Sequence, residues 1–141
     1  MRFMMLVKAT RDSEAGAPPN PELMAAIGRL TQEQLASGKL LAMIDGGGLL
    51  PSAMGARVRL AGGRVTAVDG PFTETKELVG GYAIMEVASR EDALELGRQF
   101  MQVHADVMGP SYEGELEIRP LFGAADVPDF APEHAGAEGR A

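Results

Sequence analysis

Apolar residues along this chain recur either at every second position, as in strands, or at every third and fourth position, as in helices. Residues 2–9 place apolar side chains on both faces of a strand, which predicts a central strand covered on both sides. A helix is expected to begin at Asn20-Pro21, because asparagine is a favoured N-cap and proline fits the first helical position. Gly38 is expected to end this helix.

The rest of the chain predicts a second helix and several more strands. Ser89 is expected to cap that helix together with Asp92, and Gly109-Pro110 to end it. Residues 11–19 are polar and rich in proline, which predicts a loop. The expected strands cover residues 40–44, 56–60, 64–69, 80–87 and 115–121, with Ala61-Gly62-Gly63 as a hairpin connection.

The order of these elements predicts an α+β fold, a ferredoxin-like split βαβ sheet with an inserted β-hairpin. Both helices then lie on one face of the sheet. Met4, Leu6, Ile84 and Val58 indicate that apolar side chains also point to the other face, so we expect a second copy to cover it in a homodimer. The domain is expected to span residues 1–122, followed by a flexible tail at 123–141 that is rich in alanine, glycine, proline and acidic residues.

Composition narrows the classes of protein to which the chain can belong. With 13 basic and 20 acidic residues the net charge is −7, which argues against nucleic-acid binding. No stretch approaches the roughly 18 apolar residues that span a membrane, and no signal-peptide pattern precedes the first strand, so we expect a cytoplasmic protein. The absence of cysteine excludes disulfides and a thiol nucleophile.

The sequence gives no support for a metal or a cofactor, and we expect neither. His104 is the one histidine within the expected domain, and the carboxylates show no ligand spacing. The glycines after Asp45 lack the Lys-Ser/Thr of a phosphate loop, and no dinucleotide-binding fingerprint follows a strand. Asp45 is either part of a lid over a pocket or part of a plain loop.

The segment from Asp69 to Glu77 is the most distinctive part of the sequence. It reads Asp-Gly-Pro-Phe-Thr-Glu-Thr-Lys-Glu, which combines three acids, a lysine and two threonines with a Gly-Pro turn. Gly70-Pro71 predicts a sharp turn, because proline presets its φ and glycine accepts unusual angles. The turn would leave Asp69 at the end of a strand and place the other polar groups over a neighbouring surface.

This segment resembles the signature of the DGPF branch of the YCII-related proteins. Matching stretches at residues 1–9, 55–59 and 115–122 extend the resemblance over most of the chain. The resemblance implies that two chains pair their sheets into a dimeric α+β barrel. It implies no particular reaction.

Two positions depart from these relatives. The better-studied branch of YCII-related proteins carries a histidine on the first helix that pairs with an aspartate, and Met24 stands at the matching position here. DGPF relatives often carry a histidine before a Pro-Ser pair, and Leu50 stands there instead. The resemblance therefore implies a more apolar pocket without the usual imidazoles.

The candidate site residues centre on the Gly-Pro segment. Asp69 is a candidate general acid or base, or else a turn residue bonded to its own backbone. His104 is its candidate proton-transfer partner, or else a satisfied core histidine. The expected substrate-binding residues are Arg57 and Lys76 as anchors for an anionic group, with Asp45, Phe72, Glu74 and Tyr82, and each has a plain structural alternative.

Three functions fit these residues. The first is a cofactor-independent enzyme of lyase, isomerase or cyclase type that acts on a small organic molecule. The second is a non-catalytic ligand-binding or regulatory module, because many of the relatives that it resembles sit beside sigma factors. The third is a structural dimer in which the signature turn only orders the sheet.

Overall fold

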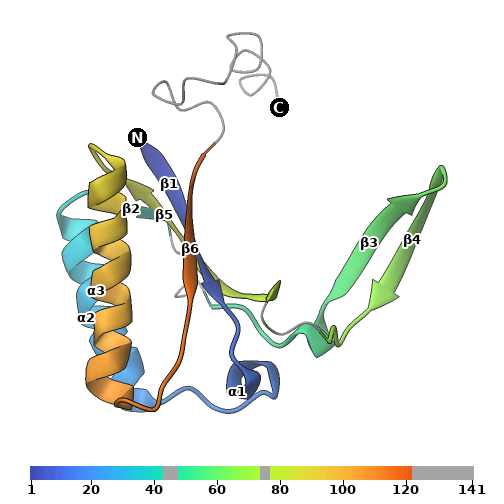
Figure 1. Ribbon diagram of the computed structural model, residues 1–141, viewed down its shortest axis with the longest axis horizontal. Coiled ribbons are helices and arrows are strands. Elements are labelled where there is room, and N and C mark those ends of the chain that lie inside the picture. Colours follow the sequence, from blue (N-terminus) through green and yellow to red (C-terminus); the bar gives the residue numbers. More distant parts are fainter. Residues whose placement is uncertain (43–47, 74–76, 122–141) are drawn as a thin grey trace, which may run out of the picture.

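The computed structural model describes residues 1–42, 48–73 and 77–121, and Figure 1 shows how their elements are arranged. Asp45, Glu74 and Lys76 lie outside the described residues, as does the expected tail at 123–141. The elements are β1 (Arg2–Lys8), α1 (Arg11–Glu14), α2 (Pro21–Ala36), β2 (Leu40–Ala42), a 3₁₀ turn (Ser52–Met54), β3 (Ala56–Ala61), β4 (Arg64–Asp69), β5 (Val79–Glu86), α3 (Arg90–Met108) and β6 (Leu116–Pro120).

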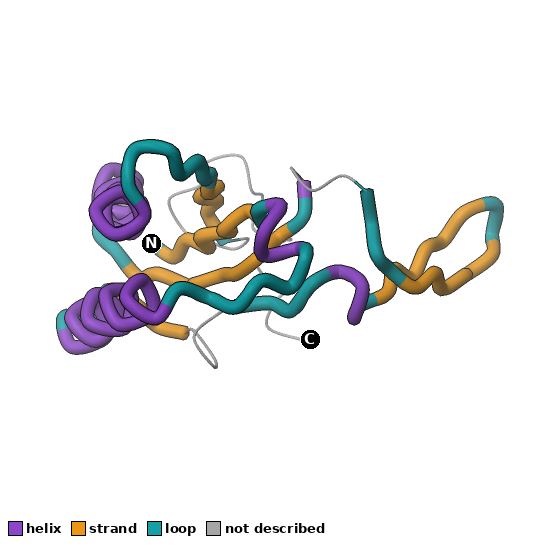
Figure 2. Tube along the Cα trace, turned by 90° about the horizontal axis from the view of Figure 1, so that it is seen from below, coloured by secondary structure: helices purple, strands orange, loops and turns teal. Residues whose placement is uncertain are grey.

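Four strands form an open sheet in the order β2-β5-β1-β6, and all neighbours in it are antiparallel. The central strands β1 and β5 are distant along the chain and pair with Met5 opposite Ala83. α2 and α3 lie over one face of this sheet and leave the other face uncovered (Figures 1 and 2). The protein therefore has an α+β fold, and its described strands form no closed barrel within one chain.

The predicted helix starts are confirmed by their caps. The Asn20 side chain accepts hydrogen bonds from the backbone N–H groups of Glu22, at 2.9 Å, and Leu23, at 3.1 Å. The Ser89 hydroxyl accepts one from the backbone of Asp92 at 3.1 Å. Such bonds satisfy donors that a helix start leaves without a partner.

The loop predicted for residues 11–19 is wrong at its beginning, where the short helix α1 forms. A reciprocal capping box explains it: the Thr10 hydroxyl accepts from the Ser13 backbone at 3.1 Å, and the Ser13 hydroxyl accepts from the Thr10 backbone at 2.9 Å. The proline-rich residues 17–20 follow as a connection to α2. α1 therefore lies directly after the central strand β1.

The core lies between the helical layer and the sheet face beneath it. Phe3 and Met5 of β1 are buried there, whereas Met4 and Leu6 point to the uncovered face and are half-buried. Gly97 lets α3 approach β6 closely, because a Cβ at this position would lie only 2.8 Å from Cδ1 of Ile118. The core cluster consists of Phe3, Met5, Leu40, Ala83, Met85, Val87, Ala93 and Leu96.

β3 and β4 form a separate two-stranded hairpin. They pair without interruption from Ala56 opposite Asp69 to Ala61 opposite Arg64, which confirms the predicted hairpin. We call residues 56–69 the arm. The arm extends away from the rest of the chain on the side of the sheet opposite α2 and α3 (Figures 1 and 2).

Candidate functional site

The sheet face that α2 and α3 leave uncovered has an apolar centre, and we call it the open face. Met4 pairs with Ile84 and Leu6 with Tyr82 across the two central strands, so these four side chains share one surface. All four are half-buried in the chain. An apolar surface of this kind is typical of ligand pockets and of subunit interfaces.

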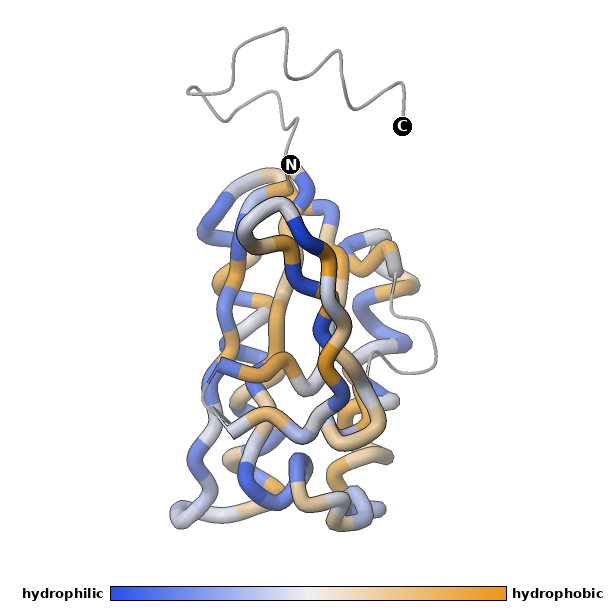
Figure 3. The backbone as a smooth tube through the Cα atoms, turned by 90° about the vertical axis from the view of Figure 1, so that its right-hand side faces the viewer, coloured by the Kyte–Doolittle hydropathy of each residue, from blue (hydrophilic) through white to orange (hydrophobic). Residues whose placement is uncertain are grey.

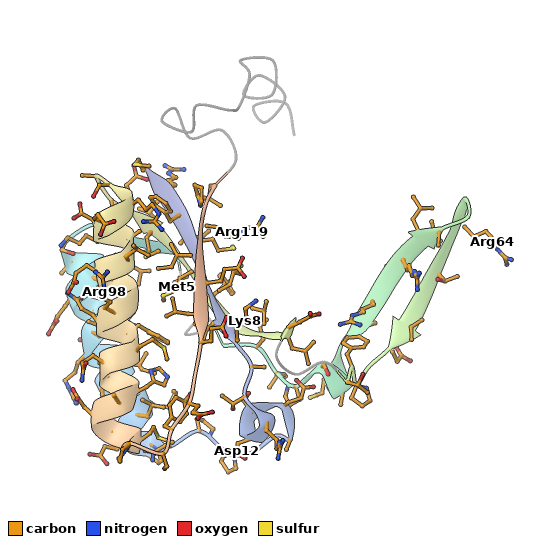
Figure 4. The ribbon with its side chains drawn as sticks, viewed as in Figure 1. Met5, Lys8, Asp12, Arg64, Arg98 and Arg119 are labelled. Atoms are coloured by element: carbon orange, nitrogen blue, oxygen red, sulfur yellow. The ribbon has the colours of Figure 1, made fainter. Side chains whose placement is uncertain are left out.

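One end of the open face carries an ion pair. Lys8 Nζ lies 3.2 Å from Glu117 Oε1, and only 18% of the Lys8 side chain is exposed. Arg119 Nε lies 3.6 Å from the other oxygen of the same carboxylate. Figure 4 shows Lys8 and Arg119 on the side away from α3, whereas Met5 points toward the helices. Because electrostatic attraction is stronger where water is excluded, a partly desolvated ammonium group is suited to hold an anionic ligand.

Tyr82 adds a phenol to the same end of the open face. It stands opposite Leu6, and Leu6 stands opposite Glu117 on the other side, so Tyr82 shares a face with the carboxylate that pairs with Lys8. Its ring is half-buried, and a phenolic hydroxyl both donates and accepts hydrogen bonds. The predicted role of Tyr82 in ligand binding is thus compatible with its position.

The Gly-Pro loop (residues 70–73) is fastened to α1 through Ser52. The Phe72 backbone N–H donates to the Ser52 hydroxyl at 3.0 Å, and the Ser52 backbone N–H donates to Glu14 Oε1 at 2.8 Å. The Ser52 hydroxyl donates to the same carboxylate oxygen. Since α1 directly follows β1, this chain of hydrogen bonds ties the loop to the end of the strand that carries Lys8.

Arg57 and Phe72 meet at the base of the arm. The Arg57 guanidinium carbon lies 3.8 Å from the centroid of the Phe72 ring, a cation–π contact. The prediction that both residues belong to one site is consistent with this contact. Arg57 retains the capacity to pair with an anion, because stacking leaves the edge of a guanidinium group free to donate hydrogen bonds.

Asp69 ends β4 at the base of the arm, opposite Ala56, and it is exposed. A general base in an apolar cavity needs to be shielded from water. The described residues provide no such shielding at Asp69. The catalytic role predicted for this residue would therefore require a covering surface from outside the chain.

His104 is buried within the helical side of the molecule and is only 6% exposed. Its Nδ1–H donates to the Phe100 carbonyl at 2.9 Å, and its ring centroid lies 4.6 Å from that of Phe100 and 5.5 Å from that of Tyr112. Burial raises the pKa of the Tyr112 hydroxyl. These contacts are those of a core histidine, the plain alternative for this residue.

The predicted catalytic pair is not brought together within one chain. His104 lies on α3, and Asp69 lies at the base of the arm, which leaves from the other side of the sheet (Figure 1). Arg57 and Phe72 are in contact. Of the remaining predicted residues, Tyr82 is on the open face, and Asp45, Glu74 and Lys76 lie outside the described residues.

Sequence reasoning missed Lys8, Glu117, Glu14 and Ser52 as candidate site residues. Lys8 follows an apolar run in the first strand, where an isolated charge is a usable signal of a role beyond solubility. Glu117 alternates with apolar residues between two other charged residues, and its position gives no such signal. Ser52 follows Leu50-Pro51, where the resembling proteins carry a histidine, and nothing in the sequence around it marks its hydroxyl. Nothing in the sequence pairs Glu14 with Ser52, because their contact joins residues that are 38 positions apart.

Two further observations hold for the part of the chain that the structure describes. Its histidine and acidic side chains form no group of three or more that could hold a metal ion. Its helices include none with the length and apolar character needed to cross a bilayer.

Comparison with known proteins places the geometry in a family. A family model described as the YCII-related domain matches residues 1–109. The chain is also 33% identical over 73 residues to an uncharacterised protein of Rhizobium meliloti (strain 1021), a match that covers 52% of this chain. The matched stretch spans 54% of that relative, about half its length.

Proposed function

Because the chain belongs to the YCII-related domain family, we propose that it binds a small organic molecule on the open face, beside the Gly-Pro loop. The observation that supports this most is the Lys8–Glu117 pair, in which the lysine side chain is only 18% exposed although it lies on a face that no long helix covers. Lys8 would attract an anionic group of the ligand, and Tyr82 would hydrogen-bond it. The apolar centre of the face would contact the rest of the molecule.

The proposal includes a homodimer in which two copies pair their open faces. The strand order β2-β5-β1-β6 supports a ferredoxin-like sheet, and two such sheets face to face would give a dimeric α+β barrel. The distribution of residues supports the same arrangement, with an apolar centre and ion pairs toward the edges. Interfaces between protein subunits commonly have such an apolar core and polar rim.

For the chemistry, we propose cofactor-independent proton transfer of the lyase or isomerase type. Glu117 would take a proton from a carbon atom of the bound molecule, and Tyr82 would hydrogen-bond the substrate oxygen on which negative charge develops. Glu117 would then return the proton to another atom of the substrate in an isomerase, or to the departing group in a lyase. One positioned acid or base accelerates a reaction by roughly 10²–10⁴-fold. Asp69 would contribute only in the homodimer, where the second copy would shield it.

A non-catalytic ligand-binding or regulatory function is the second candidate. It is favoured by the His104 ring, which bonds to the Phe100 carbonyl instead of facing the open face. It is also favoured by Met24 and Leu50, which are exposed at the positions where the resembling proteins carry histidines. In this case the ligand would be released unchanged.

A thermal-shift screen against small organic acids and cell extract tests the proposal. A ligand of this site should raise the melting temperature of the natural protein and of Arg2→Met, but not that of Lys8→Met. Arg2 is a matched control, because it forms the ion pair with Glu86 at the other end of the same face. Equal shifts in both variants would place the ligand elsewhere and overturn the proposed site.

The fate of the ligand then separates the two candidate functions. Chromatography coupled to mass spectrometry after incubation should reveal a product with a new retention time. Its mass should be unchanged if the protein is an isomerase and lower by the mass of the eliminated group if it is a lyase. Glu117→Gln should then bind the ligand and lose turnover by roughly 10²-fold or more. A ligand recovered without conversion would exclude the enzymatic function and support the binding function.

A further inference from the structure

The arm is amphipathic, and its strand register defines the two faces. Directly opposed residues of an antiparallel pair lie on the same side. Val58 is opposite Ala67, and Leu60 is opposite Val65, so these residues form one apolar face. The other face carries Arg57, Arg59, Arg64 and Thr66 together with Ala61 and Val68, and Asp69 lies at the base of the apolar face. Figure 3 shows the resulting alternation of hydropathy along the arm.

Nothing in the described chain covers the apolar face of the arm. Val58 is 74% exposed, Leu60 is 72% exposed and Val65 is 71% exposed, and every residue of both strands is exposed. A lone two-stranded hairpin is marginally stable in water and gains independent stability by packing against another element. The apolar face is therefore expected to have a binding partner.

The base of the arm is held in place, so its direction is set by the rest of the chain. The backbone N–H of Leu49, in the segment that leads to the arm, donates to the Gly80 carbonyl of β5 at 2.8 Å. The backbone N–H of Gly70 donates to the Gly55 carbonyl at 2.9 Å and joins the two ends of the arm. Ser52 is bonded to Glu14 of α1. The arm leaves on the side of the open face (Figure 1), so a molecule seated on that face would lie next to it.

Charge favours a second copy of the same chain as that molecule. Three arginines and one aspartate give the arm +2, which leaves −9 for the other residues of a chain whose total is −7. Two such acidic bodies repel each other, and each arm supplies the opposite charge. Complementary charge of this kind promotes association and selects the partner.

From these observations we infer that the arm is a clasp between two copies: the apolar face of each arm packs on the body of the other copy. This inference rests on the homodimer proposed above and adds an interface that the pairing of the sheets does not require. A two-fold axis makes the contact reciprocal, so both arms become covered at once. The arginine face of each arm points away from this apolar contact, and its positive charge attracts the acidic body of the other copy at longer range.

The absence of cysteine allows a direct test with single-cysteine variants. Leu60→Cys places an environment-sensitive fluorophore on the apolar face, and Thr66→Cys places it on the arginine face as a control. The emission of the label at position 60 should shift to the blue as protein concentration rises. The protein concentration at the midpoint of this shift should equal the midpoint of dimer formation in analytical ultracentrifugation. The emission of the label at position 66 should not change with protein concentration.

A second pair of variants tests the clasp without a label. Leu60→Lys should weaken the dimer at least tenfold, because a charge would enter the covered apolar contact. Thr66→Lys adds a positive charge to the arginine face and should leave the dimer as strong as before or slightly stronger. Both residues are exposed in the single chain, so neither change disturbs its core. Circular dichroism of the monomers would check this point.

Each other outcome overturns the inference and differs in what it implies for the proposed function. If the protein forms a dimer in which the label at position 60 stays in contact with water, and if Leu60→Lys forms this dimer equally well, the clasp is excluded but the homodimer is retained. A protein that is monomeric at every concentration excludes both. If the label at position 60 emits in the blue at every protein concentration, the arm packs on its own chain. If its emission shifts to the blue only when a different protein is added, the arm has another partner.

Discussion

At the residue scale, the Gly-Pro loop depends on a position where only glycine fits. A Cβ at Gly70 would lie 1.8 Å from the Ser52 carbonyl oxygen and 2.6 Å from its carbon, so the backbone would have to move. We expect Gly70→Ala to lower the free energy of unfolding by about 1–3 kcal/mol, the usual cost of forced overpacking. Urea unfolding measures this change.

Gly48→Ala is the matched control for that substitution. Gly48 also lies in a connection near β5, but a Cβ there would meet no atom within 4 Å. The unfolding free energy of the Gly48→Ala variant should stay within about 0.5 kcal/mol of that of the natural protein, as for most surface substitutions. If the two variants were equally stable, the packing of Ser52 against the loop would not hold in solution.

At the element scale, Tyr112 stabilises the connection between α3 and β6. Its backbone N–H donates to the Gly109 carbonyl at 3.2 Å, and its ring stacks on His104. Burial raises the pKa of Tyr112 above the ordinary value of 10.0. The folded protein thus keeps this hydroxyl protonated at a pH where the unfolded chain already ionises it.

This raised pKa predicts a loss of stability in alkaline solution. The contribution of Tyr112 to the free energy of unfolding is fully present below about pH 10. It decreases as the pH rises from there through the pKa that Tyr112 has in the folded protein. The difference in unfolding free energy between the natural protein and Tyr112→Phe should therefore be constant from about pH 7 to about pH 9 and change in favour of the variant above about pH 10. Urea unfolding over this range measures it, and a constant difference throughout would mean that Tyr112 is as hydrated as in the unfolded chain.

Local signals in the sequence predicted the elements well where they were complete within a few residues. The caps at Asn20 and Ser89 and the hairpin in the arm are of this kind. α1 was missed because its capping box uses two small hydroxyl residues, Thr10 and Ser13, in place of the more familiar glutamate. The prediction of a loop there gave too much weight to the prolines that follow.

The candidate site was harder to predict, because its contacts join distant parts of the chain. The pair of Lys8 and Glu117 forms only when β6 docks beside β1. The hydrogen bond of Ser52 to Glu14 likewise depends on how α1 and the base of the arm meet. Proximity along the sequence favoured Asp69 and its neighbours, and the apolar face of α3 suggested His104, yet this histidine serves the core.

At the scale of the whole molecule, the sequence led us to expect apolar side chains on both faces of the sheet, and the structure has them: one face is covered by helices, and the other remains open. Ile84 lies at the centre of that open face, opposite Met4. If two copies pair there, a charge at this position would have to be buried without a partner, at a cost of several kcal/mol. We therefore expect Ile84→Glu to be monomeric at concentrations where the natural protein forms dimers.

Sedimentation velocity measures this effect, and Leu35→Glu is the control. Leu35 is an exposed apolar residue too, but it lies on α2, on the other side of the sheet. Its substitution should leave the dimer intact, because the pairing proposed here does not involve the helical layer. A result in which Leu35→Glu dissociates the dimer and Ile84→Glu does not would move the interface to the helices. The open face would then need a different partner, and the site beside the Gly-Pro loop would be reached directly from solvent.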